Sequence, residues 1–188
     1  MKEIPKNAKL AFKGVLFETW QWEQPMFDGS VEIFECQRRP NTASVVAVID
    51  DKILIQNQRQ PDRQEPFVSL PGGRCDKEDW SEDPLAAAKR ELLEETGYAS
   101  DDWLLWYQYQ QSYKTISTVY TYIAKNCEYR RAPRLDAGEK IENRLIGFEE
   151  FLLLSESPDF WDRELKLALF RARLDESFRQ ELRKLFFN

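Results

Sequence analysis

The stretch "PLAAAKRELLEETG", Pro84–Gly97, decides how the rest of this sequence is interpreted. Its glutamates Glu91, Glu94 and Glu95 are spaced i, i+3 and i+4, and a helix would place all three on one face. Like charges at this spacing destabilise a helix by roughly 0.2–0.5 kcal/mol per pair. The face is therefore either an ordinary solvated surface or a place where a cation binds.

The residues around the glutamates predict a helix with defined ends. Asp83 is a suitable N-cap, Pro84 fits the first helical position, and Gly97 fits the C-terminal cap. One side of this helix would be buried through an apolar stripe formed by Leu85, Ala88, Leu92 and Leu93.

Three carboxylates on one helical face suit a hard cation such as Mg²⁺ or Mn²⁺, which takes oxygen ligands. Arg90 could orient the carboxylates through charge-assisted contacts. Just upstream, the Gly72-Gly73 turn could present a bare carbonyl oxygen as a further ligand. The residues indicate a metal–carboxylate site suited to a phosphate-bearing substrate, with a plain acidic surface as the alternative.

The composition limits the possible functions. The chain has 188 residues, 42% of them hydrophobic and 32% charged, which suits one soluble globular domain. A net charge of −6 argues against a protein that binds extended nucleic acid. The chain has no histidine, which excludes Ser-His-Asp and Cys-His catalysis and histidine-ligated zinc.

Cysteine usage and hydropathy predict where the protein works. Cys36, Cys75 and Cys127 are far apart and form no CxxC pair, so we expect neither a disulfide framework nor a thiolate zinc site. The N-terminal "MKEIPKNAKLAFKG" lacks the apolar run of a signal peptide, and no stretch is apolar enough to span a membrane. We expect a cytoplasmic protein without a membrane partner.

Alternating apolar residues on both sides of the helix predict several strands. A turn at Asp28-Gly29 separates the first two strands, and Asp50-Asp51 joins the arms of a hairpin. The stretch "RRAPRLDAGEKIEN" is expected to be a polar loop. The expected strands are "GVLFETWQWEQ", "SVEIFECQRR", "SVVAVI", "KILIQNQ", "FVSLPGG", "WLLWYQYQQ", "STVYTYIAKN" and "RLIGF".

Helices are expected in "FEEFLLLSES" and again from Asp159 to Phe187. Strands mixed with helices along one chain favour an α/β sandwich over an all-β fold or a helical bundle. We expect residues 1–40 to form a separate antiparallel strand layer. The main domain would then comprise residues 41–188 with its C-terminal helices.

The segment "GGRCDKEDWSEDPLAAAKRELLEETGY" resembles the signature of the Nudix hydrolases. That signature is a glycine, five residues, a glutamate, seven residues, then Arg-Glu-apolar-x-Glu-Glu-x-Gly-apolar. From Glu82 onward the match is complete. Eight residues instead of five lie between Gly73 and Glu82, so Asp79 is a rival to Glu82 for the first acidic position. An insertion into a loop has a small thermodynamic cost.

The resemblance implies an α/β/α sandwich with a mixed β-sheet. It also implies cleavage of a nucleoside diphosphate linked to another moiety, with Mg²⁺ or Mn²⁺ and water. Carried over, the metal ligands would be Glu91, Glu94, Glu95 and the Gly72 carbonyl. Arg90 would hold the glutamates, and it joins Glu94 and Glu95 among the expected catalytic residues. Structural roles in the signature would fall to Gly73, Glu82 and Gly97.

Outside the signature, the chain is similar to the ADP-ribose and nucleoside-diphosphate-sugar pyrophosphatases. The shared features are an N-terminal strand layer, the stretches "QRRP" and "SLPGG", and the acidic loop "LDAGEKIE". This subgroup implies a homodimer that exchanges its N-terminal strands, and a further carboxylate from Glu139 or Glu142 as base or metal ligand. The order Gln58-Arg59-Gln60 departs from the Gln-x-Arg of the subgroup by one position.

Guanidinium groups pair well with phosphate, and aromatic rings stack on bases or sugars. We take Arg39 as the first candidate for a diphosphate contact. Trp80, in the inserted loop, is a candidate lid over the substrate. For every residue of this kind, an ordinary surface, core or dimer-interface position is the alternative. The further substrate-binding candidates are Arg38, Arg59, Trp20, Trp22 and Phe27.

The sequence thus predicts a metal-dependent hydrolase that splits a small nucleotide substrate at its diphosphate bridge. A nucleotide sugar such as ADP-ribose would give a nucleoside monophosphate and a sugar phosphate. One alternative is a nucleoside triphosphate pyrophosphohydrolase of the same fold. A second alternative is a catalytically silent nucleotide-binding module.

Overall fold

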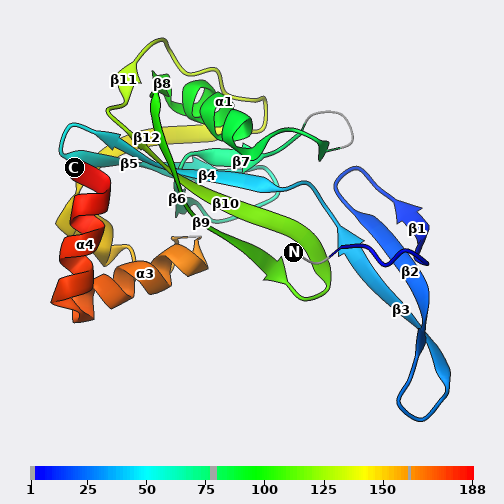
Figure 1. Ribbon diagram of the computed structural model, residues 1–188. Helices are drawn as coiled ribbons and strands as arrows, with labels where there is room; N and C mark the ends of the chain where they lie inside the picture. Colours follow the sequence, from blue (N-terminus) through cyan, green and yellow to red (C-terminus); the bar gives the residue numbers. More distant parts are fainter. Residues whose placement is uncertain (1–2, 77–79, 161) are drawn as a thin grey trace.

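The computed structural model describes residues 3–76, 80–160 and 162–188. Its centre is a ten-stranded mixed sheet with the order β1-β2-β3-β10-β4-β5-β12, to which β6, β7 and β9 add at β5, β4 and β10 (Figure 1). The strands of this sheet are β1 (Lys9–Lys13), β2 (Glu18–Pro25), β3 (Val31–Arg38), β4 (Thr42–Ile49), β5 (Lys52–Arg59), β6 (Phe67–Ser69), β7 (Gly72–Arg74), β9 (Asp102–Ser112), β10 (Thr115–Lys125) and β12 (Lys140–Gly147).

The other elements are four helices and a small two-stranded sheet within the described ranges. The two strands are β8 (Tyr98–Ala99) and β11 (Glu128–Tyr129). The helices are α1 (Pro84–Thr96), α2 (Phe148–Leu153), α3 (Arg163–Leu174) and α4 (Glu176–Phe187). None of the described helices is both long and apolar enough to cross a membrane.

Helices cover both faces of the sheet, with α1 on one side and α2, α3 and α4 on the other (Figure 1). The alternation along β4 explains why both faces are apolar. Val45 and Ala47 belong to the cluster packed against α1, whereas Val46 and Val48 belong to the cluster beneath α2–α4. The predicted α/β sandwich with a mixed sheet is confirmed.

The expected caps of α1 are present. The Asp83 carboxylate accepts a hydrogen bond from the Ala86 amide at 2.9 Å, and Pro84 occupies the first turn. Gly97 ends the helix at φ 78°, where a residue with a β-carbon is strained, and its amide donates to the Leu93 carbonyl. Both ends of the helix that carries the glutamates are therefore fixed by local sequence.

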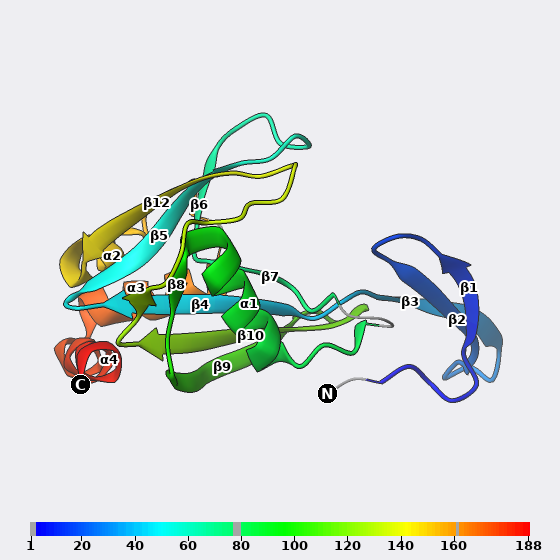
Figure 2. The same cartoon turned by 90° about the horizontal axis from the view of Figure 1, so that it is seen from above.

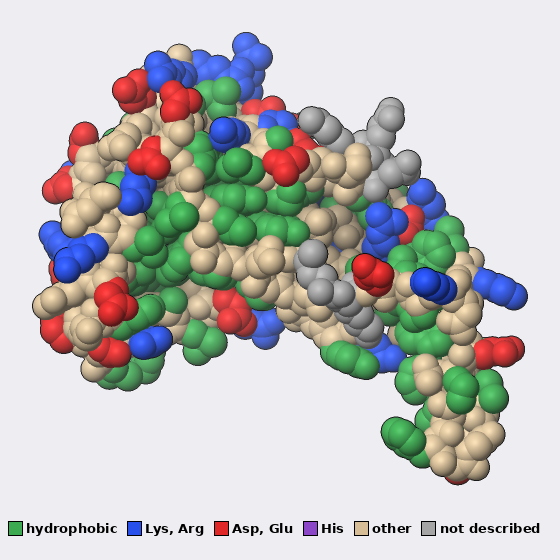
Figure 3. Space-filling model, in the orientation of Figure 1, with side chains coloured by type: hydrophobic (Ala, Val, Ile, Leu, Met, Phe, Trp, Pro, Cys, Tyr) green, Lys and Arg blue, Asp and Glu red, His purple; other side chains and the backbone are tan. Residues whose placement is uncertain are grey.

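The strands β1, β2 and β3 form an antiparallel layer that extends away from the rest of the molecule (Figure 2). It joins the main sheet where the end of β3 pairs in parallel with β10, Gln37 opposite Thr115 and Arg38 opposite Ile116. Apolar side chains gather on its surface (Figure 3). The exposed ones are Leu10, Phe12, Val15, Leu16, Phe17, Phe27, Val31 and Ile33.

Several expected boundaries were wrong. The polar loop "RRAPRLDAGEKIEN" ends at Gly138–Glu139, because β12 begins at Lys140 and pairs with β5 along its whole length. The single strand "FVSLPGG" is two strands, β6 and β7, which pair with different neighbours. The helix expected from Asp159 begins at Arg163, after the Asp162 N-cap. Pairing partners, which local sequence does not reveal, decided the first two cases.

Candidate active site

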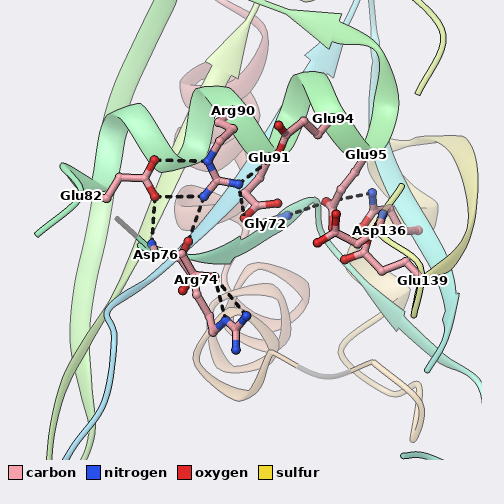
Figure 4. A network of polar contacts seen from close by, with 11 residues as sticks. Gly72, Arg74, Asp76, Glu82, Arg90, Glu91, Glu94, Glu95, Asp136 and Glu139 are labelled. Carbon is pink, nitrogen blue, oxygen red and sulfur yellow. Dashed lines mark hydrogen bonds and ion pairs between the residues drawn. The ribbon is translucent and has the colours of Figure 1, made fainter. Parts of the chain in front are cut away.

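Arg90 is the centre of a charged network on α1 (Figure 4). Its Nε and Nη2 atoms donate to the two oxygens of Glu82 at 3.2 and 3.0 Å. The Glu82 carboxylate is buried and also accepts from the Asp76 amide at 2.9 Å, while Arg90 Nη2 reaches the Arg74 carbonyl at 3.0 Å. The hydrogen bonds to Glu82 are the main reason why the pKa of Arg90 is raised, so its positive charge is secure.

The free edge of the same guanidinium group contacts two glutamates of the signature. Arg90 Nη1 lies 2.9 Å from Glu91 Oε1 and 3.1 Å from Glu94 Oε2. Glu91 has room only because residue 73 is a glycine, since a β-carbon there would lie 2.3 Å from Glu91 Oε1. Gly73 therefore acts as a cradle for a carboxylate.

The Glu95 carboxylate is held by residues of the sheet and not by Arg90. Its Oε2 atom accepts from the Gly72 amide at 2.9 Å and from Gln56 Nε2 at 3.2 Å. Asn143 Nδ2 donates to the Glu95 carbonyl at 2.9 Å and so ties β12 to the helix. Gly72 lies at φ 152°, and a β-carbon there would lie 2.2 Å from the Ala43 carbonyl oxygen. Strands β5 and β7 thus hold the Glu95 carboxylate, and β12 holds its backbone carbonyl.

Burial and mutual repulsion perturb the titration of two of these carboxyl groups. Burial raises the pKa of Glu91 to about 7, with Arg90 opposing the shift and Glu139 adding to it. Burial also raises the pKa of Glu95 to about 8, opposed by the Gly72 amide and increased by the charges of Glu91 and Glu139. Each group is costly to ionise in the metal-free protein, and a nearby cation would remove that cost.

The structure distinguishes the two candidates in the acidic loop. Glu139 lies close enough to raise the pKa of both Glu91 and Glu95, and Figure 4 shows it beside Glu95. Side chains alternate along β12, so Glu142 points to the face opposite that of Asn143, which contacts α1. Of the two, Glu139 is the residue that joins the signature glutamates.

These residues fit a divalent cation by their chemistry. Four carboxylates, a glycine cradle and two raised carboxyl pKa values concentrate negative charge at one place. In the described part of the chain, however, no three acidic groups are gathered closely enough to form a cluster that could hold a metal. Glu91 and Glu94 turn toward Arg90 instead, so they would rotate to share an ion.

The environment of Arg39 differs from that of the other arginines expected to bind substrate. It is partly buried, its guanidinium lies 5.7 Å from the centre of the Phe17 ring, and it has no ion-pair partner among the described residues. Burial and the charge of Arg74 lower the pKa of Arg39. A desolvated arginine beside a second arginine is well suited to an anion.

The N-terminal candidates lie elsewhere in this chain. Arg38 pairs with Glu18 at 3.4 Å, and Trp22 is buried against Phe34 at a centroid distance of 6.2 Å. Phe27 is fully exposed at the turn between β2 and β3, which points away from α1 (Figure 1). Within one chain, the structure does not bring these three to the glutamates.

A groove of about 720 Å³ opens beside the acidic loop, between the ends of β5, β6 and β12. Arg59 lines it together with Glu139 and Glu142. Arg59 faces the side of β5 opposite to Gln58, which bonds to Gln56 at 2.7 Å. The rest of the lining is formed by Asn57, Gln58, Pro66, Phe67, Val68, Leu135, Lys140, Ile141 and Asp159.

Sequence reasoning missed Gln56 and Asn143, which hold Glu95 from two neighbouring strands. Gln56 is a buried amide at the end of the apolar run "ILI", and that position was the available signal. Asn143 gave no signal, because its strand was taken for a loop. Glu82 occupies the first acidic position of the signature in the structure, whereas its rival Asp79 lies outside the described residues.

Comparisons with known proteins agree with this geometry. The model of the NUDIX domain family matches residues 38–168, which is more than half of the chain. A protein of Bacillus methanolicus named methanol dehydrogenase activator is 25% identical over 158 residues, covering 82% of this chain and 83% of the relative. An ADP-ribose pyrophosphatase of Bacillus subtilis (strain 168) is 25% identical over 173 residues, covering 90% and 92%.

A solved structure described as an ADP compounds hydrolase has the same fold. It superposes with a TM-score of 0.74 over 95% of both chains, at 20% sequence identity. The likeness includes the N-terminal strand layer, because the superposition covers nearly the whole chain. The sequence signature and the architecture therefore agree.

Proposed function

We propose, starting from the fact that this chain belongs to the NUDIX family and is a Nudix hydrolase, that it cleaves the diphosphate bridge of a nucleotide sugar. The products would be a nucleoside monophosphate and a sugar phosphate. The observation that carries the proposal is how the signature glutamates are held on α1: Arg90 bonds to Glu91 and Glu94, and the Gly72 amide bonds to Glu95.

The divalent cation would be Mg²⁺ or Mn²⁺, held by Glu91, Glu94 and Glu95, with the Gly72 carbonyl as a further ligand. When bound, such an ion neutralises diphosphate charge and lowers the pKa of water. Arg90 keeps the carboxylates oriented, because its position is fixed by Glu82. Burial of these groups in a weakly solvated site strengthens their interaction with developing charge on phosphorus.

Glu139 is our candidate for the residue that accepts a proton from the attacking water. It comes from a loop next to Glu91 and Glu95, and its neighbour in sequence, Lys140, begins a strand that fixes the end of that loop. Glu142 faces the other side of β12 and we assign it no step. A carboxylate is the natural base here, because the chain has no histidine.

The substrate class follows from the cationic groups and from the relatives. Arg39 is a desolvated guanidinium without an ion-pair partner among residues 3–76, 80–160 and 162–188. Arg59 lies directly opposite Lys140 across β5 and β12, but both face the side of the sheet away from the glutamates, so Arg39 is the cationic group that supports this substrate class. We infer ADP-ribose as the first substrate to test, since one relative is named an ADP-ribose pyrophosphatase.

Product analysis tests this function. The protein is incubated with Mg²⁺ and a panel of nucleotide sugars, dinucleotides and nucleoside triphosphates, and the phosphorus-containing products are separated. A nucleoside monophosphate with a sugar phosphate supports the proposal. Release of inorganic pyrophosphate from triphosphates would contradict it and favour the triphosphate alternative. Tight binding without turnover would favour a silent module. Glu181→Gln, an exposed glutamate on α4, is the matched control for Glu95→Gln.

We further propose a homodimer in the cytoplasm. Exposed apolar residues crowd the β1–β3 layer, with Phe12 and Ile33 more than 60% exposed, and a second copy of the chain would cover them. In such a dimer, Trp22 and Phe27 of one subunit would lie nearer to the second subunit. All three cysteines are buried thiols that form no disulfide among the described residues, which suits a reducing compartment. Sedimentation velocity measures the oligomeric state directly.

A further inference from the structure

The segment between β7 and α1 carries a tryptophan that contacts the N-terminal layer. The guanidinium group of Arg38, at the end of β3, lies 5.2 Å from the centre of the Trp80 ring. This distance is within the range of a cation–π interaction. Trp80 is half-buried, and it stands two residues before Glu82, the residue that clamps Arg90.

The cation on the ring is itself held in place. Arg38 Nη1 lies 3.4 Å from Glu18 Oε2, and Glu18 is buried, with only 5% of its surface exposed. Glu18 also pairs with Lys13 at 3.6 Å and accepts from Trp20 Nε1 at 3.1 Å. A buried carboxylate with several partners has little freedom to move, so Trp80 rests on a fixed point of the layer.

The backbone at Trp80 is unusual for a bulky residue. Its φ is 59°, in the left-handed region that side chains with a β-carbon rarely adopt. Such a conformation persists where surrounding contacts hold it. A small cavity of about 110 Å³ beside the ring is lined by Lys13, Gly14, Val15, Glu18, Arg38 and Trp80, so the ring and the β1–β2 turn share one surface.

The other end of the segment leads into the charged network of α1. After Trp80 the chain passes through Ser81 to Glu82, whose carboxylate bonds to Arg90 and to the Asp76 amide. Arg90 in turn contacts Glu91 and Glu94. The layer and the signature glutamates are therefore linked by one cation–π contact, two peptide units and one bidentate ion pair.

We propose, on the basis of the carboxylate metal site described under the proposed function, that Trp80 is a positioning residue. It fixes Glu82 against the N-terminal layer, and through Arg90 it sets the positions of Glu91 and Glu94. In this role Trp80 touches neither metal nor substrate, and it replaces the lid expected from the sequence.

The test uses two variants and two readouts. Trp80→Ala removes the ring, whereas Trp80→Phe keeps an aromatic face for Arg38. We expect the Mn²⁺ dissociation constant to rise about tenfold in Trp80→Ala, the lower end of the effect of supporting residues on metal affinity. In Trp80→Phe it should change by no more than about twofold. The resonance of the Arg90 Nε–H group, recorded by NMR in the metal-free protein, should shift only in Trp80→Ala.

Lys89→Gln is the matched control. Lys89 lies on α1 next to Arg90 and places its ammonium 5.8 Å from the centre of the Trp103 ring, so its removal deletes a similar contact on the same helix. It should leave both readouts unchanged. The proposal is overturned if Trp80→Ala leaves the Arg90 resonance and the Mn²⁺ affinity at their original values, or if Lys89→Gln changes them equally. Because the resonance is measured without metal or substrate, its outcome is independent of whether nucleotide sugars are hydrolysed.

Discussion

The main domain and the β1–β3 layer differ in how many of their large apolar side chains are buried. In the main domain, the apolar residues are inside, and Phe151, Leu92 and Ile53 are completely buried. In the layer, Phe12 and Ile33 face solvent while the carboxylate of Glu18 is buried among cations. Burying a phenylalanine or isoleucine contributes about 1.5–3 kcal/mol, so the layer forgoes a gain that the main domain obtains.

The apolar clusters of the main domain are covered within one chain, whereas the layer exposes several large apolar side chains. The strained and charged groups of the main domain gather around α1, where Glu95 is buried at the expense of its ionisation. A fold can carry such a group because the apolar clusters on both sides of the sheet supply the stability. The candidate active site therefore lies in the main domain, and we propose the exposed apolar surface of the layer as the subunit interface.

The largest effect on activity should follow from replacing a buried carboxylate of the main domain. Glu95→Gln removes the most buried carboxylate of the site but keeps an oxygen that can accept from the Gly72 amide. We expect kcat/KM for nucleotide-sugar hydrolysis to fall by at least about 10³-fold, the effect of losing one group that stabilises charge in a transition state. Steady-state kinetics with Mg²⁺ measures the loss, and an activity within tenfold of the original would contradict our assignment.

The neighbouring glycines Gly72 and Gly73 should separate stability from activity. Gly72→Ala would place a β-carbon against the Ala43 backbone at a positive φ, so we expect a destabilisation of about 3 kcal/mol or more. Gly73→Ala would meet only the mobile end of Glu91, which can move aside. We expect near-normal thermal unfolding for Gly73→Ala and a loss of about 10²-fold in kcat, because misplacing one reacting group has that effect.

Equal effects of the two substitutions would contradict this division. If Gly73→Ala unfolded as readily as Gly72→Ala, the Glu91 side chain would be rigidly held instead of displaceable. If Gly73→Ala retained full activity, Glu91 would have no role at the position that the structure gives it. Thermal denaturation and kinetics on the same preparations provide both comparisons.

The pH dependence of stability should also distinguish the site from the rest of the fold. Glu95 has a pKa of about 8 and Glu91 of about 7 in the folded protein, against an ordinary value of 4.5. The folded state retains protons that the unfolded chain releases, so this contribution to stability is complete below about pH 4.5 and is lost as the pH rises toward 8. At about 1.4 kcal/mol per pKa unit, the two shifts together predict a loss of up to about 8 kcal/mol in the metal-free protein over this window.

Denaturant titrations between pH 5 and pH 8 without divalent cations measure this decline. Glu95→Gln should flatten it, because glutamine does not titrate. Saturating Mg²⁺ should oppose it, since a bound cation favours the ionised carboxylates. A metal-free protein that gains stability as the pH rises from 5 to 8 would show that burial does not hold these protons.

The smallest effect on the fold should come from the layer. Replacing the exposed Phe12 and Ile33 with serine touches no buried cluster, so we expect the far-UV circular dichroism spectrum to stay unchanged. The molecular mass in sedimentation velocity should fall from that of a dimer to that of a monomer. A mass that does not change would mean that this apolar surface is not the subunit interface.

The parts predicted from sequence are those fixed by local chemistry. Asp83, Pro84 and Gly97 were sufficient to set the ends of α1, and the spacing of Glu91, Glu94 and Glu95 was sufficient to place them together. The strand "SVVAVI" was also predicted correctly, and its unbroken apolar run agrees with its burial in β4. Local sequence decided these features because each depends on residues within one or two turns of helix or along one strand.

The parts that were not predicted depend on contacts between distant segments. The choice between Glu139 and Glu142 required the register of β12 on β5, and that strand looked like a polar loop. Gln56 and Asn143 meet Glu95 from two separate strands, β5 and β12, and local sequence does not reveal that these strands bring them to the helix. The exposure of Phe12 could not be inferred from alternation alone, because alternation shows that a strand has two faces and not which face is covered.

Calorimetric titration of Mn²⁺ into the metal-free protein tests the central claim most directly. Two buffers of different ionisation enthalpy at pH 7 reveal the protons released on binding. We predict that the original protein binds Mn²⁺ and releases protons from Glu91 and Glu95, while Glu95→Gln binds at least about tenfold more weakly and releases fewer. Equal affinity and equal proton release in the two proteins would contradict the assignment of a metal site to these glutamates.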